Sequence, residues 1–233
     1  MPSSLAHIFV ALTWAAVTPG VYAASRRLNR RFSAWWSSPL LITWSACLFL
    51  LIASNTSYED YLSGTNWLIL LLGPTTVAFA VPIYEQRALI RRHGAVLLVG
   101  VLVGSGLSIA CSWLLASLLH LSPELRASLL PRSITTPLAM IASSNIGGVP
   151  ELTAVFTAVT GLFGAAIGAP LLDWLRIESG FAKSSLLAMG AHGAGVGRAY
   201  QFGQMEGSIA SVVMVLAGLL NVIVASLAGF LLA

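Results

Sequence analysis

The chain alternates between long apolar stretches and short polar ones, in a pattern that repeats about eight times. The apolar stretches cover residues 5–24, 36–53, 67–84, 95–118, 125–146, 152–172, 184–200 and 208–232. A helix needs roughly 20 mostly apolar residues to cross a bilayer, and a helix satisfies its own backbone hydrogen bonds where lipid cannot. The pattern therefore predicts an all-α, polytopic integral membrane protein with about eight membrane elements.

The composition supports the same class. Of the 233 residues, 57% are hydrophobic and 9% are charged, and the mean hydropathy is +0.87. Soluble domains carry roughly 25% charged residues, so this chain has too few to cover a water-exposed surface. No long linker or polar domain interrupts the pattern, and we predict one transmembrane domain over residues 1–233.

The basic residues predict the orientation. Four arginines lie in "RRLNRR" (26–31), directly after the first apolar stretch, and three more lie at 87–92. Such clusters mark the cytoplasmic side, whereas residues 54–66 hold two acids and no base, as expected outside. No basic residue precedes the first apolar stretch, so we expect a retained span with an external N-terminus rather than a cleavable signal. The net charge of +4 comes from these clusters and does not indicate nucleic-acid binding.

Two apolar stretches contain residues that interrupt helices. They are "LLGPTTVAFAVPIYEQ" (71–86) and "PRSITTPLAMIASSNIGGVPE" (131–151). Proline removes a backbone donor, and lipid tolerates the break only where protein or a wet cavity receives the freed groups. Matched broken helices are typical of a transporter's site near the middle of the membrane, and of an internal repeat. The alternative is a purely structural role. In that case each proline only kinks its helix, and the threonines hydrogen-bond to the backbone of their own helix. Each break carries a threonine pair, Thr75–Thr76 and Thr135–Thr136.

A third unusual stretch is "GAHGAGVGRAYQFGQMEGS" (190–208), which is rich in glycine and holds His192 and Arg198. The planar guanidinium of Arg198 suits a carboxylate, and His192 could carry a coupling proton. Six residues separate the two, so they face one cavity only if the glycines interrupt the helix. Alternatively, Gly193 and Gly197 serve close helix packing, Arg198 extends to the membrane interface, and His192 bonds a neighbouring carbonyl.

These features predict a site for an anion or polar solute near the middle of the membrane. Backbone N–H groups at the start of a half-helix and threonine hydroxyls would replace the water of the solute. Asn145 either lines this site or caps the next helix. We find no hydrolase triad, nucleotide loop or metal-ligand spacing, and expect neither an enzyme, a metal nor a cofactor. The candidate substrate-binding residues are Thr75, Thr76, Thr135, Thr136, Asn145, His192 and Arg198.

Three long blocks resemble the LrgB family, which includes CidB and the bacterial YohK-type proteins. They are residues 71–86, residues 133–165 and the stretch "MGAHGAGVGRAYQFGQMEGSIASVVMVLAGLL" (189–220). The resemblance implies a bacterial inner-membrane protein made beside a holin-like membrane partner, LrgA or CidA. Plastid glycolate/glycerate transporters resemble an LrgA-like part fused to an LrgB-like part, and this sequence has no LrgA-like part.

The resemblance also implies what the protein does. One expectation is transport of a small monocarboxylate such as pyruvate or glycolate, coupled to an ion, for which protons are the natural candidate. The other is a holin/antiholin-type regulator of murein hydrolase export and autolysis without carrier activity. A passive pore is a third alternative. A homodimer is also plausible for so small a transporter.

Overall fold

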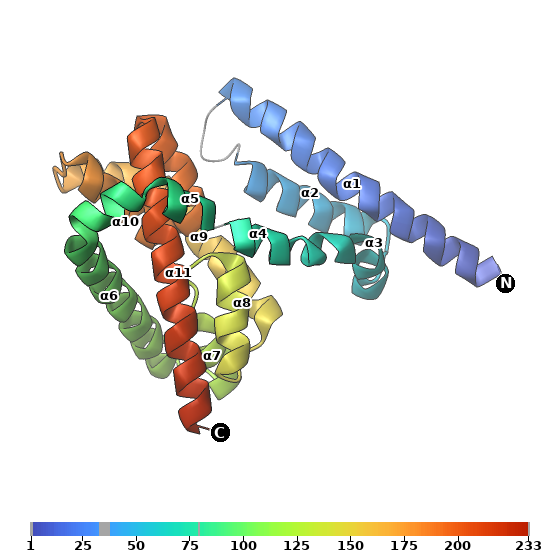
Figure 1. Ribbon diagram of the computed structural model, residues 1–233. Helices are drawn as coiled ribbons and strands as arrows, with labels where there is room; N and C mark the ends of the chain where they lie inside the picture. Colours follow the sequence, from blue (N-terminus) through green and yellow to red (C-terminus); the bar gives the residue numbers. More distant parts are fainter. Residues whose placement is uncertain (1, 33–37, 79, 233) are drawn as a thin grey trace. The chain divides into compact units, whose positions relative to one another are not determined.

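The computed structural model describes the backbone of residues 2–32, 38–78 and 80–232 (Figure 1). These residues form helices and the turns that join them, with no strand among them. Four of the described helices have the length and apolar composition to cross a membrane: His7–Phe32, Arg87–Leu118, Pro150–Trp174 and Gln204–Leu231. The all-α membrane class expected from the sequence is confirmed.

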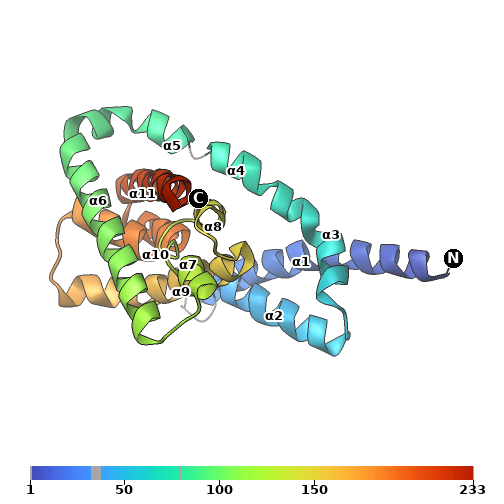
Figure 2. The same cartoon turned by 90° about the horizontal axis from the view of Figure 1, so that it is seen from below.

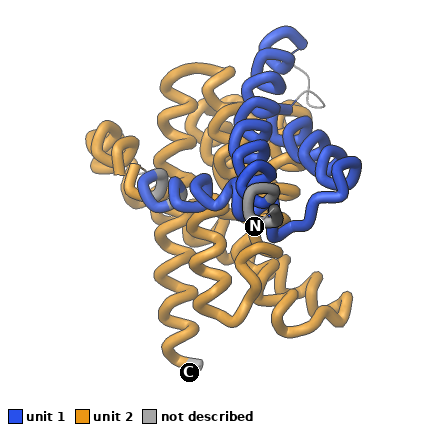
Figure 3. Tube along the Cα trace, turned by 90° about the vertical axis from the view of Figure 1, so that its right-hand side faces the viewer, with its two compact units in different colours: residues 1–75 blue, residues 76–233 orange. Residues whose placement is uncertain are grey.

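The chain divides into two compact units, residues 1–75 and 76–233 (Figure 3). In the first unit, α2 (Pro39–Ala53) and α3 (Tyr58–Leu70) pack against α1 (Pro2–Phe32). Gly64 lies against the backbone of Ala11, and Trp14 meets Tyr61 edge-to-face with 5.3 Å between ring centroids. The arginines at 26–31 extend the C-terminal turns of α1 rather than forming a separate loop.

The second unit is built around α11 (Gln204–Leu232). It contains α5 (Ala80–Glu85), α6 (Arg87–Leu118), α7 (Pro123–Leu129), α8 (Thr136–Asn145), α9 (Pro150–Trp174) and α10 (Gly180–Phe202). Helix α11 contacts α10, α8 and α6, and Figure 2 shows it nearly end-on among them. Its glycines permit this close packing, because Gly207 lies on the ring of Tyr200 and Gly218 on Leu138. Buried apolar side chains of α8, α10 and α11 form most of the core, together with Leu97 and Val101 of α6 and Leu172 of α9.

Both proline-containing stretches are interrupted, as the sequence predicts. Residues 71–86 fall on α4 (Leu72–Ala78) and α5 (Ala80–Glu85), with a turn at Leu71. Residues 131–151 hold an irregular segment, the ten-residue α8 and a second turn before α9. None of these short helices is long enough to cross a bilayer alone.

Candidate functional site

Helix α8 begins after an interruption of the helical structure that its own sequence enforces. Pro137 lies in the first turn, where its missing N–H costs nothing, and its ring would clash with a preceding helical turn, so no helix can run into α8 from the N-terminal side. Thr135 is extended, with φ −62° and ψ 141°, but its side chain makes no capping hydrogen bond. Thr135 and Ser133 are each only 5% exposed, and neither hydroxyl oxygen has a partner. Two buried donors therefore lie unused at the positive end of a helix dipole.

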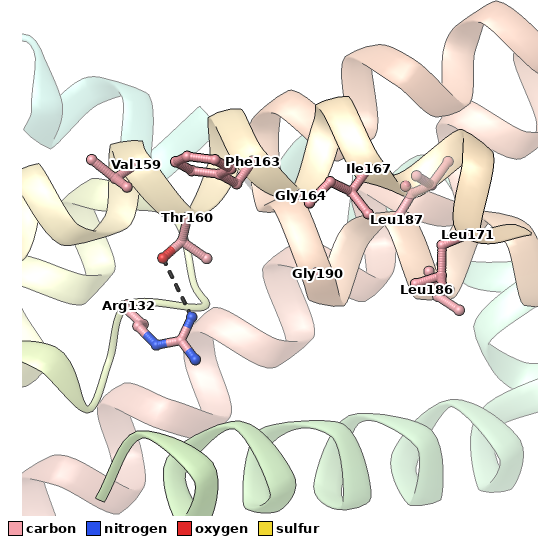
Figure 4. Close-up of a pocket in the computed structure, with 11 residues that line it drawn as sticks. Arg132, Val159, Thr160, Phe163, Gly164, Ile167, Leu171, Leu186, Leu187 and Gly190 are labelled. Atoms are coloured by element: carbon pink, nitrogen blue, oxygen red, sulfur yellow. Dashed lines mark hydrogen bonds between the residues drawn. The ribbon is translucent and has the colours of Figure 1, made fainter. Parts of the chain in front are cut away.

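Arg132 immediately precedes this helix start. Its Nε atom donates to Ser112 Oγ on α6 at 3.0 Å, and one terminal nitrogen donates to Thr160 Oγ1 on α9 at 3.4 Å (Figure 4). The side chain is half-buried, and no described carboxylate forms an ion pair with it. Neutral hydroxyls thus orient the guanidinium while its charge remains uncompensated by the described residues.

The second interruption lies inside α10, at His192. This residue has φ 37° and ψ −122°, a backbone conformation outside the helical region. The change in direction is large, because Gly195 lies against the carbonyl of Leu187, eight residues earlier. In a straight helix those residues would be about 12 Å apart. We expected His192 and Arg198 to face one cavity only if the glycine-rich helix were interrupted. The structure shows such an interruption at His192.

His192 itself is packed rather than open. Its side chain is 7% exposed, and Nε2 lies 2.9 Å from the carbonyl oxygen of Thr157 on α9, to which an Nε2–H donates. The ring fills the space that a side chain on Gly161 would need. The structure therefore shows the hydrogen bond to a neighbouring carbonyl, and the role of His192 in carrying a coupling proton stays a prediction.

The two interruptions meet at one turn of α9. His192 contacts Thr157 and Gly161, and Arg132 contacts Thr160. This turn lies close to the middle of α9, whose 25 residues span about 37 Å. If α9 crosses the bilayer, the turn lies near the membrane midplane.

A groove of about 470 Å³ opens beside this turn, and we refer to it as the Arg132 groove. Arg132 and Thr160 provide its polar groups, and Gly164 and Gly190 line it where α9 and α10 touch (Figure 4). Its remaining walls are the apolar residues Val159, Phe163, Ile167, Gly168, Leu171, Leu186 and Leu187. The groove can hold a small anion with its charge at the guanidinium and its carbon skeleton against apolar walls.

The other predicted residues have separate positions. Thr136 is the first residue of α8, beside Arg132 and the unpartnered hydroxyls. Asn145 lies at the opposite end of α8, about 14 Å away, and donates to Ser226 Oγ on α11 at 2.9 Å. Arg198 does not line the Arg132 groove, and one of its terminal nitrogens donates to Gln201 Oε1 at 2.6 Å.

Thr75 and Thr76 do not begin a helix. They are the fourth and fifth residues of the seven-residue α4, and their side chains lie outside the described residues. The four residues of "GPTT" (73–76) lie in the first turns of α4, where backbone N–H groups lack partners within the helix, and their role in binding a solute stays a prediction.

Sequence reasoning missed Arg132. The signal was present, because Arg132 is a basic residue inside an apolar stretch and three positions before Thr135. The same argument that selected Arg198 applies to it.

Comparisons with known proteins show the family to which the chain belongs. No solved structure matches the chain. The chain is 38% identical over 214 residues to the uncharacterized protein YwbG of Bacillus subtilis, covering 92% of this chain and 95% of that protein. It is 29% identical to the holin-like protein CidB of Staphylococcus aureus (strain Mu50), over 91% of this chain and 92% of CidB.

A further relative is the antiholin-like protein LrgB of Bacillus subtilis, at 29% identity over 80% of this chain and 81% of LrgB. Residues 18–230 match the family described as LrgB-like, which covers both units of the chain and every residue of the site above. With its helical membrane architecture and its match over nearly the whole length, the chain belongs to the LrgB-like family.

Proposed function

We propose that the protein is a membrane carrier for a small monocarboxylate of the pyruvate or glycolate type. One observation carries the proposal: the half-buried guanidinium of Arg132 has no carboxylate partner among the described residues and lies at the start of the interrupted helix α8, against the middle of α9.

The energetics of anion transfer explain why this arrangement suits a carrier. An unpaired carboxylate cannot enter an apolar interior without groups that replace its hydration. A guanidinium can donate two parallel hydrogen bonds to one carboxylate, and the first turn of α8 adds N–H groups at its positive end. Ser133 and Thr135 have hydroxyls free to join them. The Arg132 groove has a single cation and otherwise apolar walls. It therefore suits a solute with one negative charge better than a solute with two.

The interruption at His192 supplies the part that can move. Discontinuous helices at the midplane are typical of carriers in which one part rocks against another around the bound solute. The buried contact of His192 with Thr157 links the broken helix α10 to the turn of α9 that holds Arg132. Ion coupling, a homodimer and a requirement for an LrgA- or CidA-like membrane partner belong to this proposal as further expectations.

The names of two relatives favour a second candidate function. CidB is named holin-like and LrgB antiholin-like, which fits a regulator of murein hydrolase export and autolysis at least as well. Under that function, the charge of Arg132 would be dispensable for solute movement.

Uptake into proteoliposomes distinguishes the two candidates. The purified protein, with and without an LrgA-like partner, is given labelled pyruvate or glycolate under a proton gradient. We expect saturable uptake that Arg132→Gln reduces to background and that Arg91→Gln leaves unchanged. Arg91 is an exposed arginine on the first turns of α6 and therefore a matched control.

The opposite outcomes are equally clear. Absence of uptake under every condition contradicts the carrier proposal and favours the regulator. Uptake that rises linearly with solute concentration and does not depend on the proton gradient indicates a passive pore.

A further inference from the structure

A second groove lies within the second unit (residues 76–233), and we refer to it as the Arg126 groove. It has a volume of about 350 Å³ and runs between α6, α7, α8 and α11. Its walls are mostly apolar, with Ile109 and Trp113 from α6 and Val224, Ala225 and Ala228 from α11. Its polar groups come from Arg126 and Asn221.

The two polar groups differ in how they are bonded. Asn221 is 4% exposed, and its amide nitrogen donates to Ser105 Oγ at 2.9 Å and to the carbonyl of Ala217 at 2.8 Å. It therefore ties α11 to α6 at the deep end of the groove. Arg126 makes no such bond: its Nε atom is shielded from solvent and has no partner, and no described carboxylate forms an ion pair with it.

The groove has the features of a lipid site at a membrane interface. Trp113 is 52% exposed, and tryptophan side chains are enriched where the acyl region meets the headgroups. Helices α6 and α11 run in the same direction (Figure 1). Apolar side chains of both helices line the groove together with Arg126. A shielded guanidinium beside such side chains complements a phosphate attached to an acyl chain.

We propose that the Arg126 groove binds an anionic phospholipid of the surrounding bilayer, with its phosphate at Arg126 and an acyl chain between α6 and α11. This site is separate from the Arg132 groove, and the proposal does not depend on carrier activity. An anionic headgroup gains about 1 kcal/mol per arginine near the surface, which corresponds to about a fivefold preference over a zwitterionic lipid.

Lipid binding to the purified full-length protein tests the proposal. Phosphatidylglycerol and phosphatidylcholine with identical acyl chains are added in detergent, and bound lipid is counted by native mass spectrometry. We expect phosphatidylglycerol to bind about fivefold more tightly to the unmodified protein. Arg126→Gln should abolish this preference, whereas Arg91→Gln should preserve it. Ala228→Leu, which fills the groove without a change of charge, should weaken the binding of both lipids.

Two further measurements keep the proposal falsifiable if Arg126→Gln fails to fold. A phosphatidylglycerol with a photoreactive acyl chain should crosslink to residues 109–131 and 221–228 of the unmodified protein. Crosslinks confined to other segments overturn the proposal. Inorganic phosphate alone should neither stabilise the protein nor compete, and phosphate that does so as well as the lipid would identify a free-anion site instead. Equal binding of both lipids also overturns it, as expected if an apolar helix of a partner protein fills the groove.

Discussion

The imidazole of His192 occupies the space that a side chain on Gly161 would need. Because His192 is also the residue at which α10 breaks, this contact fixes the broken helix against the middle of α9. A methyl group at position 161 would push the ring away from the carbonyl of Thr157, to which it is bonded.

We therefore expect Gly161→Ala to impair both stability and uptake. Overpacking a tight contact costs about 1–3 kcal/mol of the free energy of unfolding, and the displaced ring disturbs the turn that holds Arg132. The measurements are the thermal midpoint in detergent and uptake into proteoliposomes. Gly106→Ala on α6 is the control, because its new Cβ would meet open space. Equal results for the two variants would show that the His192 contact has no special role.

The orientation of Arg132 yields a second prediction. Ser112 is fully buried, and its hydroxyl accepts from Arg132 Nε. Loss of one such bond changes an interaction free energy by about 0.5–1.5 kcal/mol, so Ser112→Ala should raise the half-saturation concentration about two- to tenfold. Ser117→Ala is the control on the same helix, because Ser117 bonds only the carbonyl of Trp113. A change in maximal rate without a change in half-saturation would argue against a role in substrate binding.

Arg198 provides a direct contrast with Arg132. One of its terminal nitrogens is held by Gln201, and it does not line the Arg132 groove. We expect Arg198→Gln to leave uptake within about twofold of the unmodified protein, whereas Arg132→Lys should weaken it about tenfold because an ammonium lacks the planar fork. Concentration-dependent uptake of labelled pyruvate measures both. If Arg198→Gln abolished uptake and Arg132→Lys did not, the anion site would lie on α10 and not at Arg132.

The helix interruptions show how much the sequence could predict. The break before Thr136 follows from Pro137, because the proline ring clashes with a preceding helical turn whatever the tertiary fold. The break in α10 was expected within a glycine-rich stretch, but it falls on His192. Among the glycines, Gly195 accommodates the bend by meeting the Leu187 carbonyl, and Gly190 permits close packing of α10 against Gly164 on α9. Which residue absorbs the bend depends on contacts with α9 that local sequence does not reveal.

Arg132 illustrates the same limit for the site. Its partners, Ser112 and Thr160, are 20 and 28 residues away in the chain. Intrinsic chemistry marks both Arg132 and Arg198 as candidates, because each is a cation in an apolar stretch. Only tertiary contacts distinguish the arginine that lines a groove from the one bonded to a neighbour on its own helix.

The N-terminus of α3 yields a prediction about pH. Asp60 accepts from the Ser57 hydroxyl at 2.8 Å, and its other carboxylate oxygen lies 2.9 Å from His7 Nδ1 on α1. The Ser57 hydroxyl, and secondly His7, lower the pKa of Asp60 from its ordinary value. A carboxylate whose pKa is lower in the folded state stabilises the fold above its unfolded pKa, which is about 3.9, and loses this contribution as pH falls through the folded pKa.

We therefore expect Asp60→Asn to lower the thermal midpoint more at pH 6 than at pH 2.5, because the contribution of ionised Asp60 is lost as the pH falls through its lowered pKa. Asparagine keeps the size of the side chain and an acceptor for the helix start, so the difference between the two pH values isolates the charge. Thermal midpoints of both proteins, measured between pH 2.5 and 7 in the same detergent, should converge as the pH falls. Glu59→Gln is the control, because Glu59 is the neighbouring acid in the same helical turn. A constant offset between Asp60→Asn and the unmodified protein at every pH would show that the link between α1 and α3 does not depend on ionised Asp60.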